Sequence, residues 1–408
     1  MRHEPSRRTV LGGLGLAAGL AVAGPARRAY CANETIGIGV IGCGGRSRAA
    51  LMPALKKIPG VRFVAVCDVY EEHLKAGQYV AGGSEIFATV DHQELLARRD
   101  VDAVIIGSPD HLHVPQTIDA CNAGKDVYVE KPFTHDLKEG AAAIEAQDRT
   151  QRIVQIGTQQ RSMTHLIEAK KLIETGVLGP VRKIQMTWNR NLLPLRKHPY
   201  NIKPQQVDWK RFLGNAPDQP FDAHKMRNWR WFWDFGGGIF TDLMVHWYDT
   251  VDWMLDLGTP ATAASIGNHF AAEGIWETPD TVQTLLSFPK KGTQLHFEGT
   301  FVNQHGKAYT AIMGEQATLY LDRGRFELIP EPNRNVEPRQ MILGSGERGS
   351  DFFDQPDGEL LHLTEWIEAI RSRRKPNCPA EAGVRSAAAA HLANIALREE
   401  RVAKGSES

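Results

Sequence analysis

The sequence predicts an α/β protein with an N-terminal, doubly wound parallel sheet and a C-terminal α+β domain that has a large open, mainly antiparallel sheet. Two observations support this fold class. From residue 35 to residue 157, short apolar runs alternate with helical patterns, which is typical of parallel βαβ units. Beyond residue 260, short runs of alternating polarity are separated by turn residues, as expected for antiparallel strands.

Composition narrows the class of protein before any motif is considered. The chain has 408 residues, with 48 Lys and Arg against 48 Asp and Glu, and 42% of its residues are hydrophobic. These values exclude a disordered chain, a fibrous repeat and a protein with several membrane spans. Because the chain has no net charge, nucleic acid would not be steered toward it, and no nucleic-acid partner is expected.

Residues 1–32 have the pattern of a twin-arginine export signal. Arg7 and Arg8 precede about sixteen small or apolar residues at positions 9–24, a stretch that is marginal for a membrane span. The alternative is a basic N-terminal tail. A twin-arginine signal implies export to the periplasm by machinery that carries folded proteins, so a cofactor could be loaded beforehand in the cytoplasm.

A glycine-rich turn lies between the first predicted strand, residues 35–41, and a helix predicted over 49–57. Gly42 would allow the tight turn, and Gly44 would let the backbone approach a pyrophosphate at the start of the helix. Ser47 stands where the dinucleotide-binding pattern has its third glycine, and this departure would loosen the contact between helix and strand. The alternative is a glycine-rich turn in an α/β domain that binds no nucleotide.

An acidic residue follows the second predicted strand, residues 61–67. At that position the Asp68 carboxylate can bind the hydroxyl groups of a ribose, which favours NAD over NADP. Arg46 and Arg48 leave room for a 2′-phosphate, so NADP remains an alternative. The order of strand, glycine-rich turn, helix, strand and acid predicts a Rossmann domain that binds NAD, and we place this domain at 33–158.

The rest of the first domain continues the same alternation. Helices are predicted over 71–80, 91–98, 114–123 and 137–150, and strands over 101–107, 126–129 and 153–157. Parallel sheets bind their ligands beyond the carboxyl ends of the strands. Five residues fall just beyond such ends: Asp68, Pro109, His113, Lys131 and Gln159.

Three blocks of the sequence are similar to a known family. They are Ser-Pro-Asp-His-Leu-His at 108–113, Gly-Lys-Asp-Val-Tyr-Val-Glu-Lys-Pro at 124–132, and Gly-Gly-Gly-Ile-Phe-Thr-Asp at 236–242, which His246 follows. They resemble the Gfo/Idh/MocA family of NAD(P)-dependent sugar and polyol oxidoreductases, and the resemblance covers nearly everything after the export segment. A few members of that family cleave glycosides by transient oxidation.

The resemblance implies roles for individual residues. The family's catalytic lysine corresponds to Lys131, and its helical Asp-x-x-x-His pair corresponds to Asp242 and His246. The family often pairs subunits through the open sheet of its second domain, so a homodimer or homotetramer is expected. The residues expected to bind the cofactor are Gly42, Gly44, Gly45, Arg46, Asp68, Ser108, Pro109, His113, Glu130, Lys131 and Gln159.

A change of pattern after residue 161 indicates a second domain, which we place at 159–408. The stretch 190–235 is too long for an ordinary connector and is expected to shape a site or an interface, whereas 333–356 is expected to be a polar loop. Helices are predicted over 163–175, 240–257, 360–373 and 380–398, and strands over 181–189, 262–270, 281–287, 294–301, 309–313, 317–321 and 325–329.

The helix predicted from residue 240 carries a polar face formed by Asp242, His246, Asp249 and Trp253. Oxidation of a secondary alcohol needs a base near neutral pH, a role that suits histidine. Asp242 could orient that base or bind a sugar hydroxyl, and Lys131 could polarise the same oxygen. The alternatives are a polar pair at the sheet edge or half of a metal site. No second cluster of His and Asp demands a metal, so none is expected.

Candidate substrate contacts are Arg161, Tyr200, His224, Arg230, Trp231 and Asp249. Indole rings stack on the apolar faces of sugars, although aromatic residues at such density are also ordinary core or interface material. The tryptophans of this region are Trp229, Trp231, Trp233 and Trp247.

Export constrains the function that these residues suggest. Free NAD is scarce outside the cytoplasm, so an exported enzyme would need a tightly bound NAD(H) that is recycled within each turnover. The expected function is oxidation of a secondary hydroxyl of a sugar, glycoside or polyol. One alternative is a glycosidase or lyase that works by transient oxidation and elimination, and a second is an exported sugar-binding protein without catalysis. The expected partners are a small carbohydrate and the twin-arginine export machinery.

Overall fold

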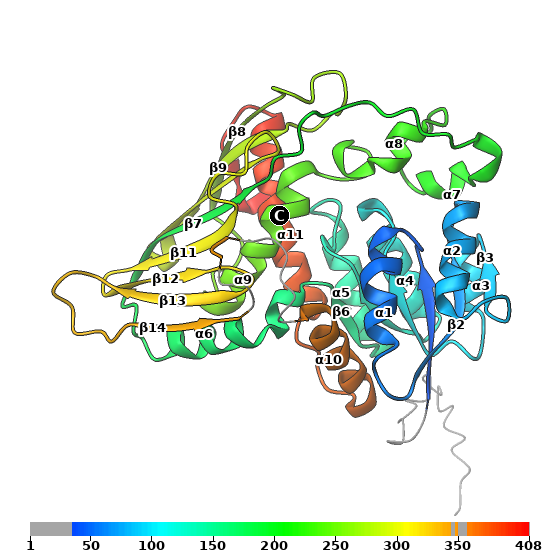
Figure 1. Cartoon of the computed structure of the whole chain (residues 1–408), viewed down its shortest axis with the longest axis horizontal. Coiled ribbons are helices and arrows are strands. Elements are labelled where there is room, and N and C mark those ends of the chain that lie inside the picture. Colours follow the sequence, from blue (N-terminus) through cyan, green and yellow to red (C-terminus); the bar gives the residue numbers. More distant parts are fainter. Residues whose placement is uncertain (1–34, 344–346, 350–356, 408) are drawn as a thin grey trace, which may run out of the picture.

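The computed structural model describes residues 35–343, 347–349 and 357–407 and confirms the expected fold class. Figure 1 shows a parallel sheet flanked by helices beside a larger sheet, with α11 (Ala380–Arg398) between the two. The predicted export segment at 1–32 lies outside the described residues. No helix in the described ranges is both long enough and apolar enough to cross a membrane.

The first sheet has six parallel strands in the order β3-β2-β1-β4-β5-β6. The strand order reverses between β1 and β4, where doubly wound sheets bind their ligands. Helices cover both faces, which explains why its central strands are runs of buried Val and Ile. The strands are β1 (Ile36–Ile41), β2 (Val61–Cys67), β3 (Phe87–Thr89), β4 (Ala103–Ile106), β5 (Asp126–Val129) and β6 (Val154–Ile156).

The helices of this domain follow the predicted order with shifted ends. The helix after the glycine-rich turn begins earlier than predicted, with a π-helical turn at Ser47–Leu51 before α1 (Met52–Leu55). The strand β3 was not predicted, because three residues are too few to show a periodic pattern. The remaining helices are α2 (Glu71–Ala81), α3 (His92–Leu96), α4 (His113–Asn122) and α5 (Glu139–Thr150).

The second sheet has nine strands in the order β14-β13-β12-β11-β7-β10-β9-β8-β15. All neighbours are antiparallel except β7 and β10, which are parallel. Two strands were not predicted: β14 lies in the expected polar loop, and β15 has two residues. The strands are β7 (Val181–Asn189), β8 (Thr262–Asn268), β9 (Thr281–Phe288), β10 (Thr293–Thr300), β11 (Ala308–Gly314), β12 (Ala317–Leu321), β13 (Arg325–Pro330), β14 (Arg339–Ile342) and β15 (Ala403–Lys404).

One face of the second sheet is covered and the other is open. On the covered face, the helices α6 (Thr164–Glu174) and α9 (Val245–Leu255) pack with α11 into an apolar core. The open face exposes large apolar side chains such as Ile266 and Leu285. The expected homodimer or homotetramer stays a prediction.

The C-terminal helix α10 (Gly358–Ser372) belongs to the core of the first domain. Its buried residues Leu363 and Trp366 pack in the same cluster as Ile36 and Ile38 of β1. The predicted boundary at residue 158 therefore separates the two sheets, but not the helices that pack against them.

The stretch 190–235 forms a covering segment over the carboxyl edge of the first sheet, where Figure 1 shows α7 (Trp209–Leu213) and α8 (Ala223–Arg227). The backbone N–H of Asp208 donates to the carbonyl of Val69 at 2.9 Å. The apolar residues that join the segment to the first domain are Tyr70, Val207, Phe212, Leu213, Met226, Phe232 and Phe235. The long stretch is thus a packed wall of the cleft described below.

Candidate active site

The glycine-rich turn needs glycine at its first position. Gly42 has a φ of +86°, and a Cβ at this residue would lie 2.5 Å from the backbone N of Ser108 and 2.6 Å from the carbonyl carbon of Gly107. At Gly44 and Gly45, a Cβ would meet nothing within 4 Å. The turn therefore presents bare backbone to open space at the start of a helix, as a pyrophosphate site requires.

Ser47, in the place of the third glycine, does not loosen the turn. Its side chain is fully buried, and its hydroxyl donates a hydrogen bond of 2.5 Å to the carbonyl of Gly42. Gly107 makes room for it, because a Cβ there would lie 2.4 Å from Ser47 Oγ. The glycine that this contact needs is therefore Gly107, directly after the neighbouring strand β4, and the expected weakening is not found.

The two kinds of glycine in the turn predict different mutant behaviour. We expect Gly42→Ala to lower the free energy of unfolding by about 1–3 kcal/mol or more, because it combines a strained φ with a backbone clash. Gly44→Ala should unfold like the parent, yet bind NAD more weakly, because its Cβ occupies the space that the pyrophosphate needs. Thermal unfolding and NAD titration of both variants check this. Equal stability of the two variants would contradict it.

Asp68 lies where a ribose-binding carboxylate is expected. One of its oxygens accepts a hydrogen bond of 2.7 Å from the N–H of Cys43, and the other accepts one of 2.8 Å from the N–H of Tyr70. These bonds hold the carboxylate at the wall of a cleft of about 770 Å³ between the first sheet and the covering segment. The glycine turn and this carboxylate therefore fit a dinucleotide.

The two arginines that could have bound the 2′-phosphate of NADP, Arg46 and Arg48, contact other protein groups instead. The guanidinium of Arg46 contacts Glu130 and Glu359, both at 2.8 Å, and Arg48 Nε donates to the carbonyl of Cys43 at 2.7 Å. Arg46 thus joins the glycine turn to α10. These contacts favour NAD over NADP.

A second cavity of about 440 Å³ adjoins the cofactor cleft. Five residues line both: Arg46, Gly107, Ser108, Trp229 and Arg230. The second cavity lies between the two domains and is the candidate substrate site.

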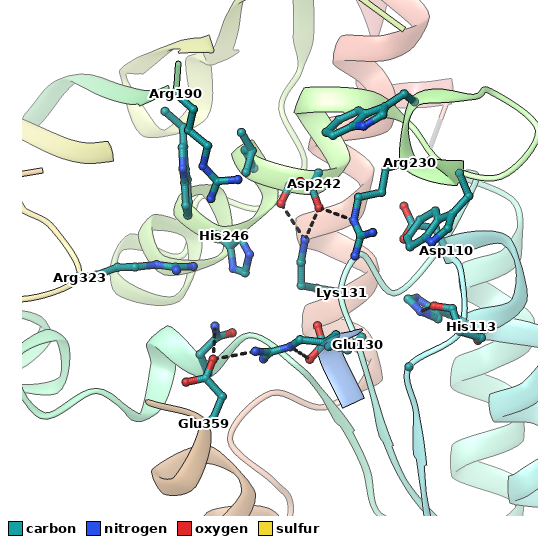
Figure 2. A pocket seen from close by; sticks show the side chains of 18 of the residues that line it. Asp110, His113, Glu130, Lys131, Arg190, Arg230, Asp242, His246, Arg323 and Glu359 are labelled. Atoms are coloured by element: carbon teal, nitrogen blue, oxygen red, sulfur yellow. Dashed lines mark hydrogen bonds and ion pairs between the residues drawn. The ribbon is translucent and has the colours of Figure 1, made fainter. Parts of the chain in front are cut away.

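Lys131 and Asp242 meet in this second cavity (Figure 2). Lys131 Nζ donates to the backbone carbonyl of Asp242 at 2.7 Å and contacts its Oδ1 at 3.1 Å. Arg230 Nε contacts the same oxygen at 3.2 Å. Burial alone would raise the pKa of Asp242, but Lys131 and two arginines hold it well below its ordinary value. Asp242 is therefore ionised, and it positions Lys131 rather than His246.

His246 lies in the same cavity and is 8% exposed. Burial, and then the positive charges of Lys131 and three arginines, hold the pKa of His246 well below its ordinary value. The ring lies 5.4 Å from that of Trp188, and Nδ1 has no hydrogen-bond partner among the described residues. The imidazole is therefore neutral and able to accept a proton. Within the described ranges, no group of three His, Cys, Asp or Glu side chains is arranged to hold a metal ion.

Several other predicted residues line one or both cavities. The ring of His113 lies between the carbonyls of Pro132 and Ser108, at 2.7 and 2.9 Å, so it joins the loops that follow β5 and β4. The predicted residues that line the substrate cavity are Arg46, Ser108, His113, Glu130, Lys131, Gln159, Arg230, Trp231, Asp242 and His246. Those that line the cofactor cleft include Gly42, Gly44, Gly45, Arg46, Asp68, Ser108 and Pro109.

Four predicted substrate contacts line neither cavity. Arg161 and Asp249 form a two-bond ion pair at 2.7 and 2.8 Å, with exposed side-chain fractions of 4% and 0%. Tyr200 contacts Asn228, and His224 contacts a backbone carbonyl at 3.0 Å. Each of the four residues therefore has a contact within the protein, and none of them is placed to contact a ligand in either cavity.

The cavity also contains residues that were not predicted from the sequence. Asp110 stands inside the block at 108–113, so that block was the signal that could have found it. Arg190 directly follows β7, Arg323 lies in the turn between β12 and β13, and Glu359 lies in α10. No local pattern links these three positions, because only the tertiary fold brings them to one cavity.

The comparisons with known proteins identify the family of both domains. A family model described as "Oxidoreductase family, NAD-binding Rossmann fold" matches residues 36–158, and one described as "GFO/IDH/MocA C-terminal domain" matches residues 211–326. An inositol 2-dehydrogenase of Gluconacetobacter diazotrophicus is 32% identical over 292 residues, which are 70% of this chain and 74% of that protein. A scyllo-inositol 2-dehydrogenase (NAD(+)) of Bacillus subtilis is 28% identical over 78% of this chain and 81% of that protein.

Solved structures share the fold. The structure of a levoglucosan dehydrogenase in complex with NADH and levoglucosan matches with a TM-score of 0.71, at 16% identity, over 91% of this chain and 99% of that chain. At this level of identity, the likeness concerns the fold alone.

Proposed function

The chain belongs to the Gfo/Idh/MocA family of NAD-binding oxidoreductases, and from this premise we propose that it oxidises a secondary hydroxyl of a sugar, glycoside or polyol. One observation carries the proposal. Lys131, held by Asp242, and a neutral His246 line one cavity that opens to the NAD cleft. The name of the inositol 2-dehydrogenase that is 32% identical to this chain supports the class of substrate.

The residues of the cavity can handle the proton of the reaction. When NAD⁺ is bound, it supplies the acceptor for the hydride that leaves the carbinol carbon. The neutral imidazole of His246 accepts the hydroxyl proton. The ammonium of Lys131 donates a hydrogen bond to the same oxygen and stabilises its developing negative charge. Asp242 keeps Lys131 in place, because both its carboxylate and its carbonyl accept from Nζ.

The covering segment supports tight retention of the cofactor. Residues 210–215 and 226–230 form the outer wall of the cleft. Arg211 pairs with Asp91 at 2.7 Å, and His111 contacts the carbonyl of Phe212 at 2.8 Å, so several contacts hold the segment to the first domain. A dinucleotide enclosed in this way would exchange slowly.

We further propose that the protein is exported to the periplasm, on the pattern of Arg7 and Arg8 before an apolar run. Export explains why retention would matter, because an exported enzyme must reoxidise its own cofactor. A second carbohydrate or another carbonyl compound would then accept the hydride. Fractionation of cells, followed by N-terminal sequencing of the mature chain, tests the localisation.

A substrate panel tests the proposed function. The purified protein should release NAD(H) on denaturation, and it should convert at least one of myo-inositol, scyllo-inositol, levoglucosan or a panel of aryl glycosides to a ketone. Reduced cofactor is followed by absorbance, and products by mass spectrometry. Release of the aglycone would favour the redox-assisted glycosidase or lyase instead. Binding of a sugar without either product would favour a sugar-binding protein, and absence of NAD binding would contradict the proposal.

A further inference from the structure

Asp110 is a buried carboxyl at the wall of the substrate cavity. It is the first residue of a short 3₁₀ helix, Asp110–Leu112, that follows β4, and only 3% of it is exposed. Figure 2 shows it near Arg230 and His113, across the cavity from Arg190 and Arg323. It therefore lies on the cofactor-domain side of the space that Lys131 and His246 share.

The carboxyl of Asp110 makes no hydrogen bond or ion pair within the part of the chain that the structure describes. Lys131 and Arg230 line the same cavity, but Lys131 Nζ and Arg230 Nε contact Asp242 instead. Among the described residues, none donates a hydrogen bond to the Asp110 side chain or forms an ion pair with it. Buried polar groups are nearly always paired, and leaving one unpaired is unfavourable. Lys131 and Arg230 act on the Asp110 carboxyl only through their charge, so its capacity to form hydrogen bonds is left for a ligand in the cavity.

The burial of Asp110 and the negatively charged residues around it favour a protonated carboxyl, which can donate a hydrogen bond to a ligand. Burial first, and then the carboxylates of Asp242 and Glu130, raise the pKa of Asp110 well above its ordinary range, although Lys131 and Arg230 oppose this. A carboxyl that takes up a proton can donate one hydrogen bond and accept others. A hydroxyl group is the complementary partner, since it also donates and accepts.

We propose that Asp110 binds a second hydroxyl group of the substrate, separate from the hydroxyl that Lys131 and His246 oxidise, and that it selects for compounds that carry both. This inference rests on the proposed function. A cavity built to hydrogen-bond a substrate hydroxyl rejects the analogue that lacks it by up to about 10⁴–10⁵-fold, because the polar group of the protein is then left unpaired. Asp110 is therefore a specificity-determining residue of the substrate cavity.

Deoxy analogues test the inference. The best substrate of the panel and its monodeoxy analogues are compared by kcat/KM in the parent, in Asp110→Ala and in Asp110→Asn. We expect one analogue to be at least about 10²-fold poorer than the full substrate in the parent. That ratio should fall below about tenfold in Asp110→Ala, while the ratios for the other positions stay as in the parent. Asp110→Asn, which still donates and accepts, should keep most of the discrimination.

The control is Asp218→Asn, an exposed carboxylate of the covering segment that lines neither cavity. It should match the parent in every ratio. Because no described residue forms a hydrogen bond or ion pair with the Asp110 side chain, the melting temperatures of both Asp110 variants should not fall below that of the parent. A marked fall would show a structural role for Asp110 and would overturn the inference.

The kinetic outcomes separate this inference from the proposed function. If the parent oxidises a member of the panel, but Asp110→Ala leaves every ratio unchanged, the inference on Asp110 is overturned and the proposed function stands. If the parent neither oxidises nor binds any member, as judged by calorimetry on the NAD-loaded protein, both are overturned.

Discussion

Replacing Lys131 with alanine is expected to lower kcat/KM by about 10²–10⁴-fold, the usual contribution of a positioned acid or base. The variant loses the ammonium that Asp242 holds at 2.7–3.1 Å and with it the donor that would stabilise the alkoxide. NAD should still bind, because Lys131 lines the substrate cavity and not the cofactor cleft. Steady-state kinetics and NAD titration measure the two effects separately.

His246→Ala should cause a loss of similar size, with a pH signature of its own. The pKa of His246 is held well below its ordinary value of 6.5, so the base form is present throughout the neutral range. In the parent, kcat/KM should therefore fall on the acid side only well below pH 6.5, and this acid limb should vanish in His246→Ala. Since the two residues act on one oxygen, the double variant should lose less than the product of the two single losses.

The matched control for these variants is Lys138→Ala, an exposed lysine that lines neither cavity. It should keep the kcat/KM of the parent. Near-parent activity in Lys131→Ala or His246→Ala would remove that residue from the mechanism, provided that the variant still binds NAD.

The first sheet could be predicted from the sequence because its strands are short, mostly apolar runs between glycine and polar signals. Parallel strands buried on both faces give the strongest such pattern, and β1, β2, β4, β5 and β6 all appeared. The short strands β3, β14 and β15 could not be recognised, since two to four residues show no period. The packing of α10 against the first domain could not be predicted from the sequence. The apolar face of a helix shows that the helix is packed, but not which sheet it covers.

The residues of the candidate site could likewise be predicted only where a contiguous stretch of sequence contains them. Lys131, Asp242 and His246 lie inside contiguous blocks, so the blocks predicted them together. We placed Asp242 and Asp249 on one polar face because we assumed a regular α-helix. Phe240–Met244 instead form a π-helical turn, and its wider hydrogen-bonding pattern rotates the residues before the turn relative to those after it. Asp249 also lies three residues beyond His246, or about 4.5 Å further along the helix axis, where it meets Arg161 instead of the cavity.

That ion pair leads to the largest expected effect on stability. Asp249→Asn is expected to lower the free energy of unfolding by about 3–5 kcal/mol, because it leaves a buried guanidinium without its negative partner. Arg161 makes two bonds to Asp249 at 2.7 and 2.8 Å, and both side chains are almost fully buried. Arg161 also donates to the carbonyl of Asn377 at 3.3 Å, so the pair joins α9 to the segment just before α11.

The control is Glu315→Gln, which breaks the exposed pair of Arg182 and Glu315. That contact is also 2.8 Å long, but the two side chains are 56% and 46% exposed, so the loss should stay below about 1 kcal/mol. The double variant Arg161→Met with Asp249→Leu should recover much of the stability, because apolar residues of similar volume avoid burying a lone charge. Chemical denaturation of the four proteins gives these values.

Kinetics of the folded Asp249→Asn protein then separate the two roles that this residue could have. Under the ion-pair interpretation, kcat/KM stays within a few-fold of the parent at temperatures well below unfolding, because Asp249 is fully buried and lines neither cavity. Under the substrate-contact interpretation that the sequence suggested, kcat/KM falls by about 10²-fold or more while stability changes little. Burial decides between them on physical grounds: a carboxylate with no exposed surface, held by two bonds to a buried guanidinium, presents no oxygen to a substrate in the neighbouring cavity.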